Sequence, residues 1–152
     1  MSVILSRSCE YALQAVLYLS HKSTDEPVAL HEISATLNVP HHFLSKILQS
    51  LSRSRIVVSR RGINGGFLLA KKASSITIYD IIRSIDGVEF IDECILGFPG
   101  CGNTPPCPIH DSWKSAKVIL LDIFQRKTIE ELGKDLVPKL DFIQQLLSKK
   151  IL

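Results

Sequence analysis

Apolar residues recur at helical spacing through the first third of the chain, in three separate repeats. The first repeat, within residues 6–21, predicts an amphipathic helix. A polar turn ending at Pro27 separates it from a short second helix that ends near Asn38, and a third helix is predicted from Pro40 onward. The apolar positions of the repeats are Ala12, Ala15, Val16 and Leu19, then Leu30, Ile33 and Leu37, then Leu44, Ile47, Leu48 and Leu51.

The third predicted helix leaves polar and basic side chains on the face opposite its apolar stripe. These side chains are His41, His42, Ser45, Lys46, Gln49 and Arg53. Two short helices joined by a tight turn, the second with such an outer face, are the parts of a helix-turn-helix. The second of them would then be the recognition helix.

The pattern changes from helical to β-favouring after this helix. Residues 56–60 and 67–70 are β-favouring runs, and they flank the glycine-rich tip at residues 62–66, so the segment predicts a hairpin. Arg60 and Arg61 stand where the first strand enters the tip. A helix-turn-helix followed at once by a basic hairpin is a winged helix, with the recognition helix suited to the major groove of DNA and the wing to the minor groove or backbone.

A further short helix is predicted after the wing, with Thr77 as its cap, Asp80 as its third residue and Gly87 after its end. The chain then loses regular periodicity between Asp86 and Ile109, where Gly and Pro are frequent. Loops of this length are usually functional or disordered.

Charge strengthens the nucleic-acid interpretation because it is regional. The chain carries 18 Lys and Arg against 15 Asp and Glu, for a net charge of +3. The stretch between Glu32 and Asp80 has no acidic residue, and its basic residues are Lys46, Arg53, Arg55, Arg60, Arg61, Lys71 and Lys72. A one-sided positive field of this kind attracts the phosphate backbone of nucleic acid, whereas a solvated face chosen for solubility would be the alternative for a charge run alone.

The composition is that of an ordinary globular protein, with 45% hydrophobic and 22% charged residues in 152. That length suits one compact domain, or a small domain with an appendage. The start of the chain lacks the basic region of a signal peptide, and no apolar run is long enough to span a membrane. We therefore expect a cytoplasmic protein without a membrane partner, whose four cysteines are thiols or ligands and not a disulfide framework.

Most of the chemistry in the sequence lies in the irregular loop. Three of the four cysteines and one histidine fall there, as Cys94-x6-Cys101-x5-Cys107-x2-His110. Cysteines flanked by Gly and Pro have no apolar face to join, so a set of soft metal ligands is the better interpretation than small core residues. The wide spacings suit an iron–sulfur cluster somewhat better than zinc, although Cys107-x2-His110 resembles part of a zinc knuckle. Cys9, in the first helix, is expected to be a small buried residue.

Four segments together resemble the IscR/NsrR superfamily of bacterial winged-helix transcription regulators. They are the first helix around Glu10-Tyr11-Ala12-Leu13, the Phe43-Leu44-Ser45-Lys46-Ile47-Leu48 helix, the Arg61-Gly62-x-x-Gly65-Gly66-Phe67-x-Leu69 wing and the loop ending Cys107-Pro108-Ile109-His110. The resemblance covers nearly the whole chain. It implies a homodimer that binds a palindromic promoter element, usually as a repressor, and that senses iron–sulfur status, redox state, nitric oxide or sulfur metabolites.

The resemblance also implies a ligand set for an iron–sulfur cluster. A [2Fe-2S] cluster is expected in preference to [4Fe-4S]. The ligands would be Cys94, Cys101 and Cys107 with His110 as the fourth, and Glu10 of the partner subunit is the alternative fourth ligand. Two departures from the pattern bear on this. Six residues separate Cys94 from Cys101 where IscR-like members tend to have five, and the recognition helix carries different polar residues, so the operator sequence cannot be transferred.

The segment after the loop predicts a long helix that is apolar on more than one face. A small winged domain cannot cover two such faces within one chain, so a second subunit is the expected cover. The expected dimer residues are Trp113, Ala116, Lys117, Leu120 and Phe124. Thr128 and Glu131 then fit a capping box that opens another helical segment, which Pro138 is expected to kink.

The sequence thus predicts a mostly helical α+β protein, a winged helix-turn-helix with a long C-terminal dimerisation helix. Residues 1–88 would form the DNA-binding domain, 89–108 the cluster loop and 109–152 the dimerisation segment. The expected DNA contacts are Pro40, His41, His42, Phe43, Ser45, Lys46, Arg53, Arg60, Arg61, Gly62, Gly65 and Gly66.

Two other kinds of function are weighed against this one. The first is the same fold with structural zinc, acting as a DNA- or protein-binding module that senses nothing. The second is an enzyme with Cys107 as nucleophile and His110 as base. We do not expect an enzyme, because no third orienting group or substrate pocket can be recognised in the sequence.

Overall fold

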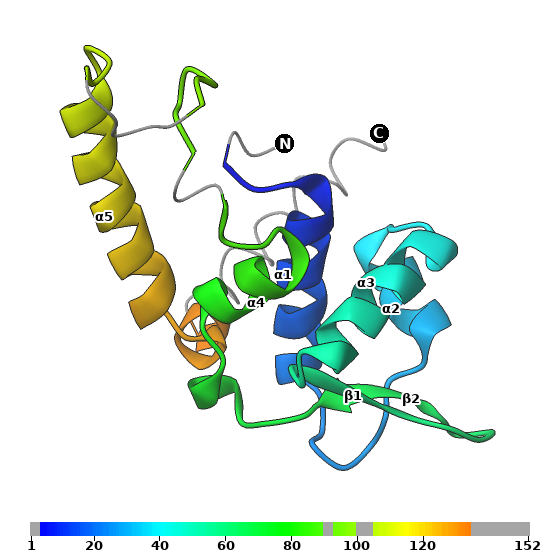
Figure 1. Cartoon of the computed structure of the whole chain (residues 1–152). Helices are drawn as coiled ribbons and strands as arrows, with labels where there is room; N and C mark the ends of the chain where they lie inside the picture. The colour runs from blue at the N-terminus through cyan, green and yellow to red at the C-terminus, as the bar shows by residue number, and fades with distance from the viewer. Residues whose placement is uncertain (1–3, 90–92, 100–104, 135–152) are drawn as a thin grey trace, which may run out of the picture.

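The computed structural model describes residues 4–89, 93–99 and 105–134. The described elements, in chain order, are the helices α1 (Arg7–Ser20), α2 (Leu30–Leu37) and α3 (His41–Arg53), the strands β1 (Val57–Arg60) and β2 (Gly66–Leu69), a 3-10 turn η1 (Ala73–Ser75), and the helices α4 (Ile78–Ile85) and α5 (His110–Arg126). Figure 1 shows α1 to α4 packed together, with the β1–β2 hairpin along one end and α5 standing to the other side. This is the mostly helical winged fold expected from the sequence.

The helix boundaries follow from local capping. Ser6 caps α1 by accepting a hydrogen bond at its hydroxyl from the backbone N–H of Cys9, and Asn38 ends α2 in the left-handed conformation at φ 52°. Thr77 and Asp80 form the expected capping box at the start of α4, each side chain accepting from the other residue's backbone N–H. The predictions for these three helices are confirmed to within a residue.

The turn between α2 and α3 is held by a short link. The Ser34 hydroxyl donates to the carbonyl oxygen of Val39 at 2.7 Å, and the Val39 N–H donates to the Ser34 carbonyl oxygen at 3.1 Å. Val39 itself is buried. The angle between the two helices of the helix-turn-helix is therefore set by one side-chain and one backbone hydrogen bond as well as by the apolar core.

The wing is an antiparallel hairpin in which Val57 pairs with Leu69 and Arg60 with Gly66. A third backbone segment pairs with β2 near the tip end of the hairpin, because Val28 and Phe67 exchange two N–H to carbonyl hydrogen bonds of 2.9 Å each. Val28 lies in the connection between α1 and α2. The hairpin is thus joined by backbone pairing to the segment that leads into the helix-turn-helix, a contact that the sequence pattern did not predict.

The hydrophobic core lies between the helices and the base of the wing. Its members come from all the helices of the winged domain: Cys9, Ala12, Ala15, Val16, Leu19, Val28, Ile33, Val39, Leu44, Ile47, Leu48, Leu51, Ile56, Val57, Ile76, Ile81, Ile82 and Ile129. The last of these residues comes from beyond α5. Thr77 pairs with Thr128, and the Ile129 N–H donates to the Ile76 carbonyl oxygen at 2.8 Å, so the chain that follows α5 returns to the core.

The Thr128–Glu131 capping box is confirmed, with reciprocal hydrogen bonds of 3.2 Å. The expected kink at Pro138 and the apolar repeat beyond it lie outside the described residues. Among the described residues, no helix combines the length and apolar character that a membrane span requires.

The buried stripe of α3 generates a prediction about stability. Leu48 is fully buried on α3, whereas its neighbour Gln49 is exposed. We expect Leu48→Ala to lower the free energy of unfolding by about 2–5 kcal/mol, because it removes buried methyl groups and leaves a cavity. Gln49→Ala is the matched control and should stay within about 0.5 kcal/mol of wild type. Urea denaturation followed by circular dichroism measures both, and equal stabilities would contradict the assigned orientation of α3.

The burial of Cys9 generates a second prediction. Cys9 is fully buried in the core, and this burial, with smaller contributions from the nearby Asp86 and Glu10 charges, raises the pKa of its thiol to about 12. At pH 8 only about one Cys9 thiol in ten thousand would be ionised, and the thiolate is the reactive form. We expect iodoacetamide to modify the half-exposed Cys94 and Cys107 in native apo-protein well before Cys9. Peptide mass spectrometry gives the order of modification, and early labelling of Cys9 would show that the N-terminal part of α1 opens readily.

Candidate nucleic-acid interface and cysteine loop

The outer face of α3 presents most of the residues that the sequence assigned to DNA binding. Pro40 is the N-cap, and the exposed side chains are His41, His42, Lys46 and Arg53, with Ser45 half-buried. The first turn of α3 has no acidic residue, so the positive end of the helix dipole is not neutralised there. A helix end of this kind, with basic side chains along the same helix, is suited to phosphate contacts and to the major groove.

Phe43 belongs to the expected DNA-binding set, but in the structure its side chain packs against α1. Its ring is half-buried and packs edge-on against Tyr11, with ring centroids 5.8 Å apart and planes at 86°. Arg7 donates from Nε to the Tyr11 hydroxyl at 3.0 Å, and its guanidinium lies over the same ring. Phe43 therefore attaches the start of α3 to α1, which fixes where the recognition helix lies.

The two arginines of the wing have different environments. Both side chains are exposed, but Arg60 Nη1 donates to the backbone carbonyl oxygen of Asp25 at 2.9 Å, which joins β1 to the α1–α2 connection. Gly66, in β2, lies so close to the Val28 carbonyl group that any Cβ atom would overlap it. The sequence placed both arginines among the expected DNA contacts, with Arg61 as the more important of the two. The structure gives Arg60 a contact that positions the hairpin, and Arg61 makes no such contact among the described residues.

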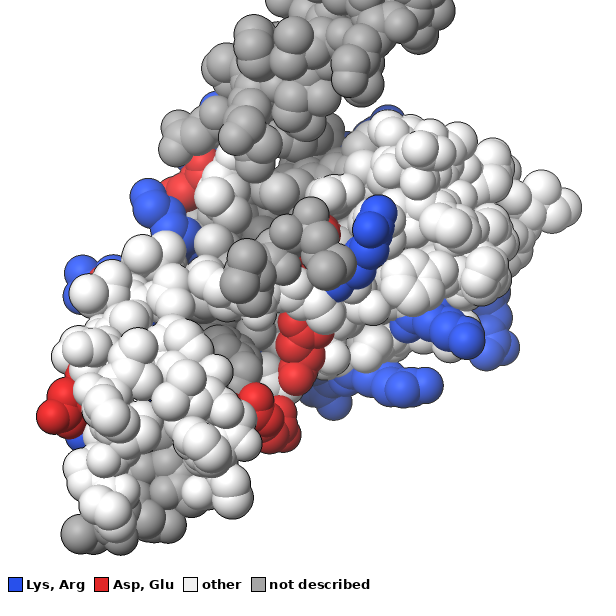
Figure 2. Space-filling model, turned by 90° about the horizontal axis from the view of Figure 1, so that it is seen from above, with Lys and Arg blue, Asp and Glu red and all other residues white. Residues whose placement is uncertain are grey.

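Basic side chains gather on the side of the molecule that carries these elements. In Figure 2, several Lys and Arg side chains project from the lower right edge, on the side where α2, α3 and the wing lie in Figure 1, and others lie at the left of the same view beside acidic side chains. The regional charge of the sequence therefore appears in the fold as a group of basic side chains at the edge that α2, α3 and the wing occupy. Such a surface is the electrostatic footprint of a nucleic-acid-binding protein.

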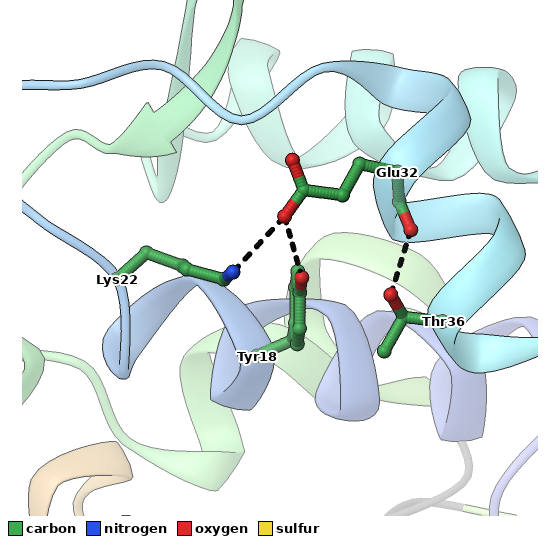
Figure 3. Close-up of polar contacts among 4 residues, drawn as sticks. All are labelled: Tyr18, Lys22, Glu32 and Thr36. Atoms are coloured by element: carbon green, nitrogen blue, oxygen red, sulfur yellow. Dashed lines mark hydrogen bonds and ion pairs between the residues drawn. The ribbon is translucent and has the colours of Figure 1, made fainter.

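Glu32 is the last acidic residue before the acid-free stretch, and its charge is paired. Its Oε1 atom accepts hydrogen bonds from the Tyr18 hydroxyl at 2.8 Å and from Lys22 Nζ at 3.0 Å (Figure 3). These two bonds, that from Lys22 contributing most, hold the pKa of Glu32 below its usual value. The Thr36 hydroxyl donates to the Glu32 carbonyl oxygen one turn along α2. The cluster joins the end of α1 to the start of α2, and no spacing rule in the sequence indicated it.

The C-terminal part of α3 is held by one serine of α4, Ser84. Ser84 Oγ donates to Ser54 Oγ at 2.8 Å and approaches the Ser50 carbonyl oxygen at 3.4 Å, while Ser50 Oγ donates to the Ser84 carbonyl oxygen at 3.3 Å. The same end of α4 also contacts α1, because the carboxylate of its C-cap Asp86 accepts from both the backbone N–H and the hydroxyl of Ser6. Helix α4, which precedes the cysteine loop, is thus hydrogen-bonded both to the recognition helix and to the cap of α1.

The structure describes only part of the predicted metal site. Cys94 and Cys107 are half-exposed reduced thiols, and His110 is the first residue of α5, with its backbone N–H donating to the Cys107 carbonyl oxygen at 3.0 Å. Cys101 lies outside the described residues. Within the described ranges, no three His, Cys, Asp or Glu side chains converge as metal ligands would. The ligand assignment therefore stays a prediction.

The residues that are described fit a soft metal centre in their chemistry. The two thiols are not buried among apolar side chains, unlike Cys9, and they lie on segments rich in Gly and Pro. Helix α5 holds the loop at two points, through the Cys107–His110 hydrogen bond and through Trp113 Nε1, which donates to the Glu93 carbonyl oxygen at 3.2 Å. Glu10, the alternative fourth ligand, lies in the first turn of α1.

Helix α5 has two kinds of apolar position. Four of the residues expected at a dimer interface (Trp113, Ala116, Leu120 and Phe124) are half-buried within the single chain, as is Lys117, whose ammonium group lies 5.8 Å from the Trp113 ring centroid, and Phe124 packs against the core. The strongly exposed apolar residues of α5 are Val118 and Ile119, each 62% exposed, and Ile123, 47% exposed. The single chain thus covers part of the expected interface and leaves a neighbouring apolar stripe open to solvent.

The comparisons with known proteins agree with this architecture. The family described as Rrf2, iron-dependent transcriptional regulator, matches residues 5–135. The regulator NsrR of Oceanobacillus iheyensis is 30% identical over 86% of this chain and 90% of its own length. The regulator IscR of Pectobacterium carotovorum is 28% identical over 84% of this chain and 77% of its own.

A solved structure extends the similarity to three dimensions. CymR, the global cysteine regulator of B. subtilis, superposes with a TM-score of 0.73 and 25% identity, covering 88% of this chain and 98% of that one. Agreement in sequence, in the helix-turn-helix and wing, and in the helix that follows the loop places the whole described chain in one group. The chain belongs to the Rrf2 family of helix-turn-helix transcriptional regulators.

Proposed function

We propose that this regulator acts in the cytoplasm as a homodimeric repressor that binds a palindromic promoter element and senses iron–sulfur, redox or nitric oxide status through a cluster in its cysteine loop. The observation that carries the proposal is the position of the loop. It joins α4, which is hydrogen-bonded to the recognition helix, to α5, which carries the exposed apolar stripe. A ligand bound there would act on DNA contacts and on subunit contacts together.

The DNA part of the proposal follows from the two exposed basic elements. Helix α3 would enter the major groove with His41, His42, Ser45 and Lys46, and the wing would reach the adjacent minor groove with Arg61. Both elements are held on one support, because Phe43 packs on α1 and the wing pairs with Val28. A rigid combination of this kind reads one half-site.

The dimer part follows from α5. In a two-fold dimer, packing of α5 on its copy would cover Val118, Ile119 and Ile123 and would extend the predicted contacts of Trp113 and Leu120. The same dimer would place two recognition helices about one DNA turn apart. A symmetric pair of half-sites, and therefore a palindrome, is the DNA sequence that matches such a dimer.

The cluster would be held by Cys94, Cys101 and Cys107, with His110 or the partner's Glu10 as fourth ligand. When bound, an iron–sulfur cluster supplies a centre that responds to oxidation and to nitric oxide. This chain supplies the mechanical part: tying the loop to one point orders the segment between α4 and α5. Asp86, at the start of this segment, accepts two hydrogen bonds from Ser6, the cap of α1. Ordering of the segment would therefore act on the position of α1 and, through it, on the Tyr11–Phe43 contact at the start of α3.

A structural zinc site is the second candidate, and the Cys107-x2-His110 spacing favours it. Anaerobic purification with iron, sulfide and zinc analysis separates the two candidates. DNA binding by the holo and apo forms then tests sensing. A brown protein whose DNA affinity changes on cluster loss supports the proposal, and a colourless protein with stoichiometric zinc and unchanged affinity overturns the sensing part.

The basic surface generates a prediction about salt. Specific DNA affinity should fall steeply with salt, since each neutralised phosphate contributes about −0.9 to the logarithmic slope. Arg61→Ala should weaken binding most among single wing substitutions and reduce the slope by about 1, because the Arg61 charge is exposed at the wing. Lys114→Ala, which removes an exposed charge from α5, is the control and should leave the slope unchanged. Fluorescence anisotropy over a salt series measures this, and a wild-type slope near zero would contradict the electrostatic argument.

The loop generates a prediction about its ligands. Ala substitution of Cys94, Cys101 or Cys107 should abolish the visible chromophore and change operator affinity by a similar amount in all three variants, whereas His110→Ala should leave a weaker, more labile cluster. Absorption spectra and operator binding under anaerobic conditions measure both effects. Cys9→Ala is the control and should keep the chromophore. If His110→Ala is unchanged while Glu10→Ala loses the cluster, the fourth ligand is the acidic residue.

A further inference from the structure

The tip of the wing is a tight turn with an aliphatic residue at its apex. The Gly65 N–H donates to the Gly62 carbonyl oxygen at 3.0 Å, which makes Ile63 and Asn64 the central residues of the turn. Neither of them has a positive φ, so the geometry is that of a type I turn. Gly62, at φ 118°, lets the chain leave β1 and enter this turn, a conformation that other residues rarely adopt.

Ile63 is the most exposed large hydrophobic residue in the described part of the chain. Its relative exposure is 105%, whereas the next most exposed, Phe98, is at 64%. Its side chain therefore contributes nothing to the core. A type I turn also has no preference for a β-branched residue at its first central position, where proline is favoured. Neither folding nor turn formation accounts for an isoleucine here.

The apex is held firmly in place relative to the recognition helix. Arg60 donates to the Asp25 carbonyl oxygen, Phe67 pairs with Val28, and Gly66 lies against the Val28 carbonyl group. Three contacts at the end of the strands nearest the tip leave little freedom at the tip itself. The exposed aliphatic side chain is consequently presented at a fixed distance from α3, next to the exposed Arg61.

We propose that Ile63 is a specificity-determining residue that enters the minor groove as an apolar wedge beside Arg61. Apolar side chains inserted there contact the sugars, partly unstack one base step and bend the duplex. Pyrimidine–purine steps such as TA and CA/TG unstack most easily, so Ile63 would favour such a step under the wing without any hydrogen bond to a base. Arg61 supplies the charge that brings the tip to the groove, and Ile63 supplies the apolar contact.

This inference rests on the placement of the wing in the minor groove proposed above. An apolar contact affects the salt dependence of DNA affinity differently from a charged contact. Loss of an apolar contact lowers affinity at every salt concentration without changing the number of phosphates neutralised. Ile63→Ser and Arg61→Ala should therefore weaken binding in different ways. The first should leave the salt slope unchanged, and the second should reduce it.

The first probe is a DNA duplex selected from random sequences by the wild-type full-length protein. The second probe is the same duplex with 2-aminopurine at the base step that the wing contacts. Ile63→Ser should bind about tenfold more weakly, or about 1.4 kcal/mol, with the salt slope of wild type. Ile63→Val keeps most of the apolar surface and should stay within about threefold. Binding of wild type should raise 2-aminopurine fluorescence, and binding of Ile63→Ser should not.

The outcomes separate the inference from the proposed function. If wild type selects no sequence, the proposed function fails. If wild type binds its selected duplex and Ile63→Ser binds it equally well with the same fluorescence rise, the wedge is refuted and the exposed apex belongs to a protein contact instead. Because Ile63 is fully exposed, Ile63→Ser should unfold at the same temperature as wild type, so weaker binding cannot be assigned to misfolding.

Discussion

The buried face of α1 is the constraint on which the rest of this structure depends. Its core residues are small or medium in size, from Cys9 through Ala12, Ala15 and Val16 to Leu19, and all are almost completely excluded from solvent. Small side chains let neighbouring helices approach closely, and α1 contacts α2, α3, α4 and the second strand of the wing. Every element expected to contact DNA is therefore positioned against the same helix.

Polar contacts at the two ends of α1 extend this control. At the N-terminal end, Ser6 holds Asp86 at the exit of α4, and Tyr11 holds Phe43 at the start of α3. At the C-terminal end, Tyr18 and Lys22 hold Glu32 at the start of α2. The ion pair is exposed and contributes little to stability by itself. Its main effect is on the orientation of α2 relative to α1. The Ser34–Val39 link extends that effect to the turn into α3.

The wing depends on backbone contacts more than on its side chains. The hairpin is short, and an isolated two-stranded hairpin is marginally stable in water. Pairing of Phe67 with Val28, together with the Arg60 hydrogen bond to Asp25, attaches it to the connection between α1 and α2. This arrangement explains why Gly66 faces the Val28 carbonyl group and why only one of the two exposed wing arginines, Arg60, hydrogen-bonds to the α1–α2 connection.

The sequence by itself determined the elements and their order. Helical periodicity, the Thr77–Asp80 and Thr128–Glu131 boxes and the glycine-rich tip depend on residues close together in the chain, and the structure confirms them. The acid-free stretch likewise indicated the basic side of the fold, because charge is a property of composition. The cysteine ligands and the dimer contacts remain predictions from spacing and resemblance.

Only the tertiary structure decided how these elements are joined. The Val28–Phe67 pairing, the Glu32 cluster, the separate environments of Arg60 and Arg61 and the return of Ile129 to the core all connect residues that are distant in sequence. Periodicity reports which face of an element is buried and not what buries it. The same limit applies to α5, whose apolar residues are half-buried on one side and exposed on the other. Which side is covered depends on where the helix lies against the winged domain.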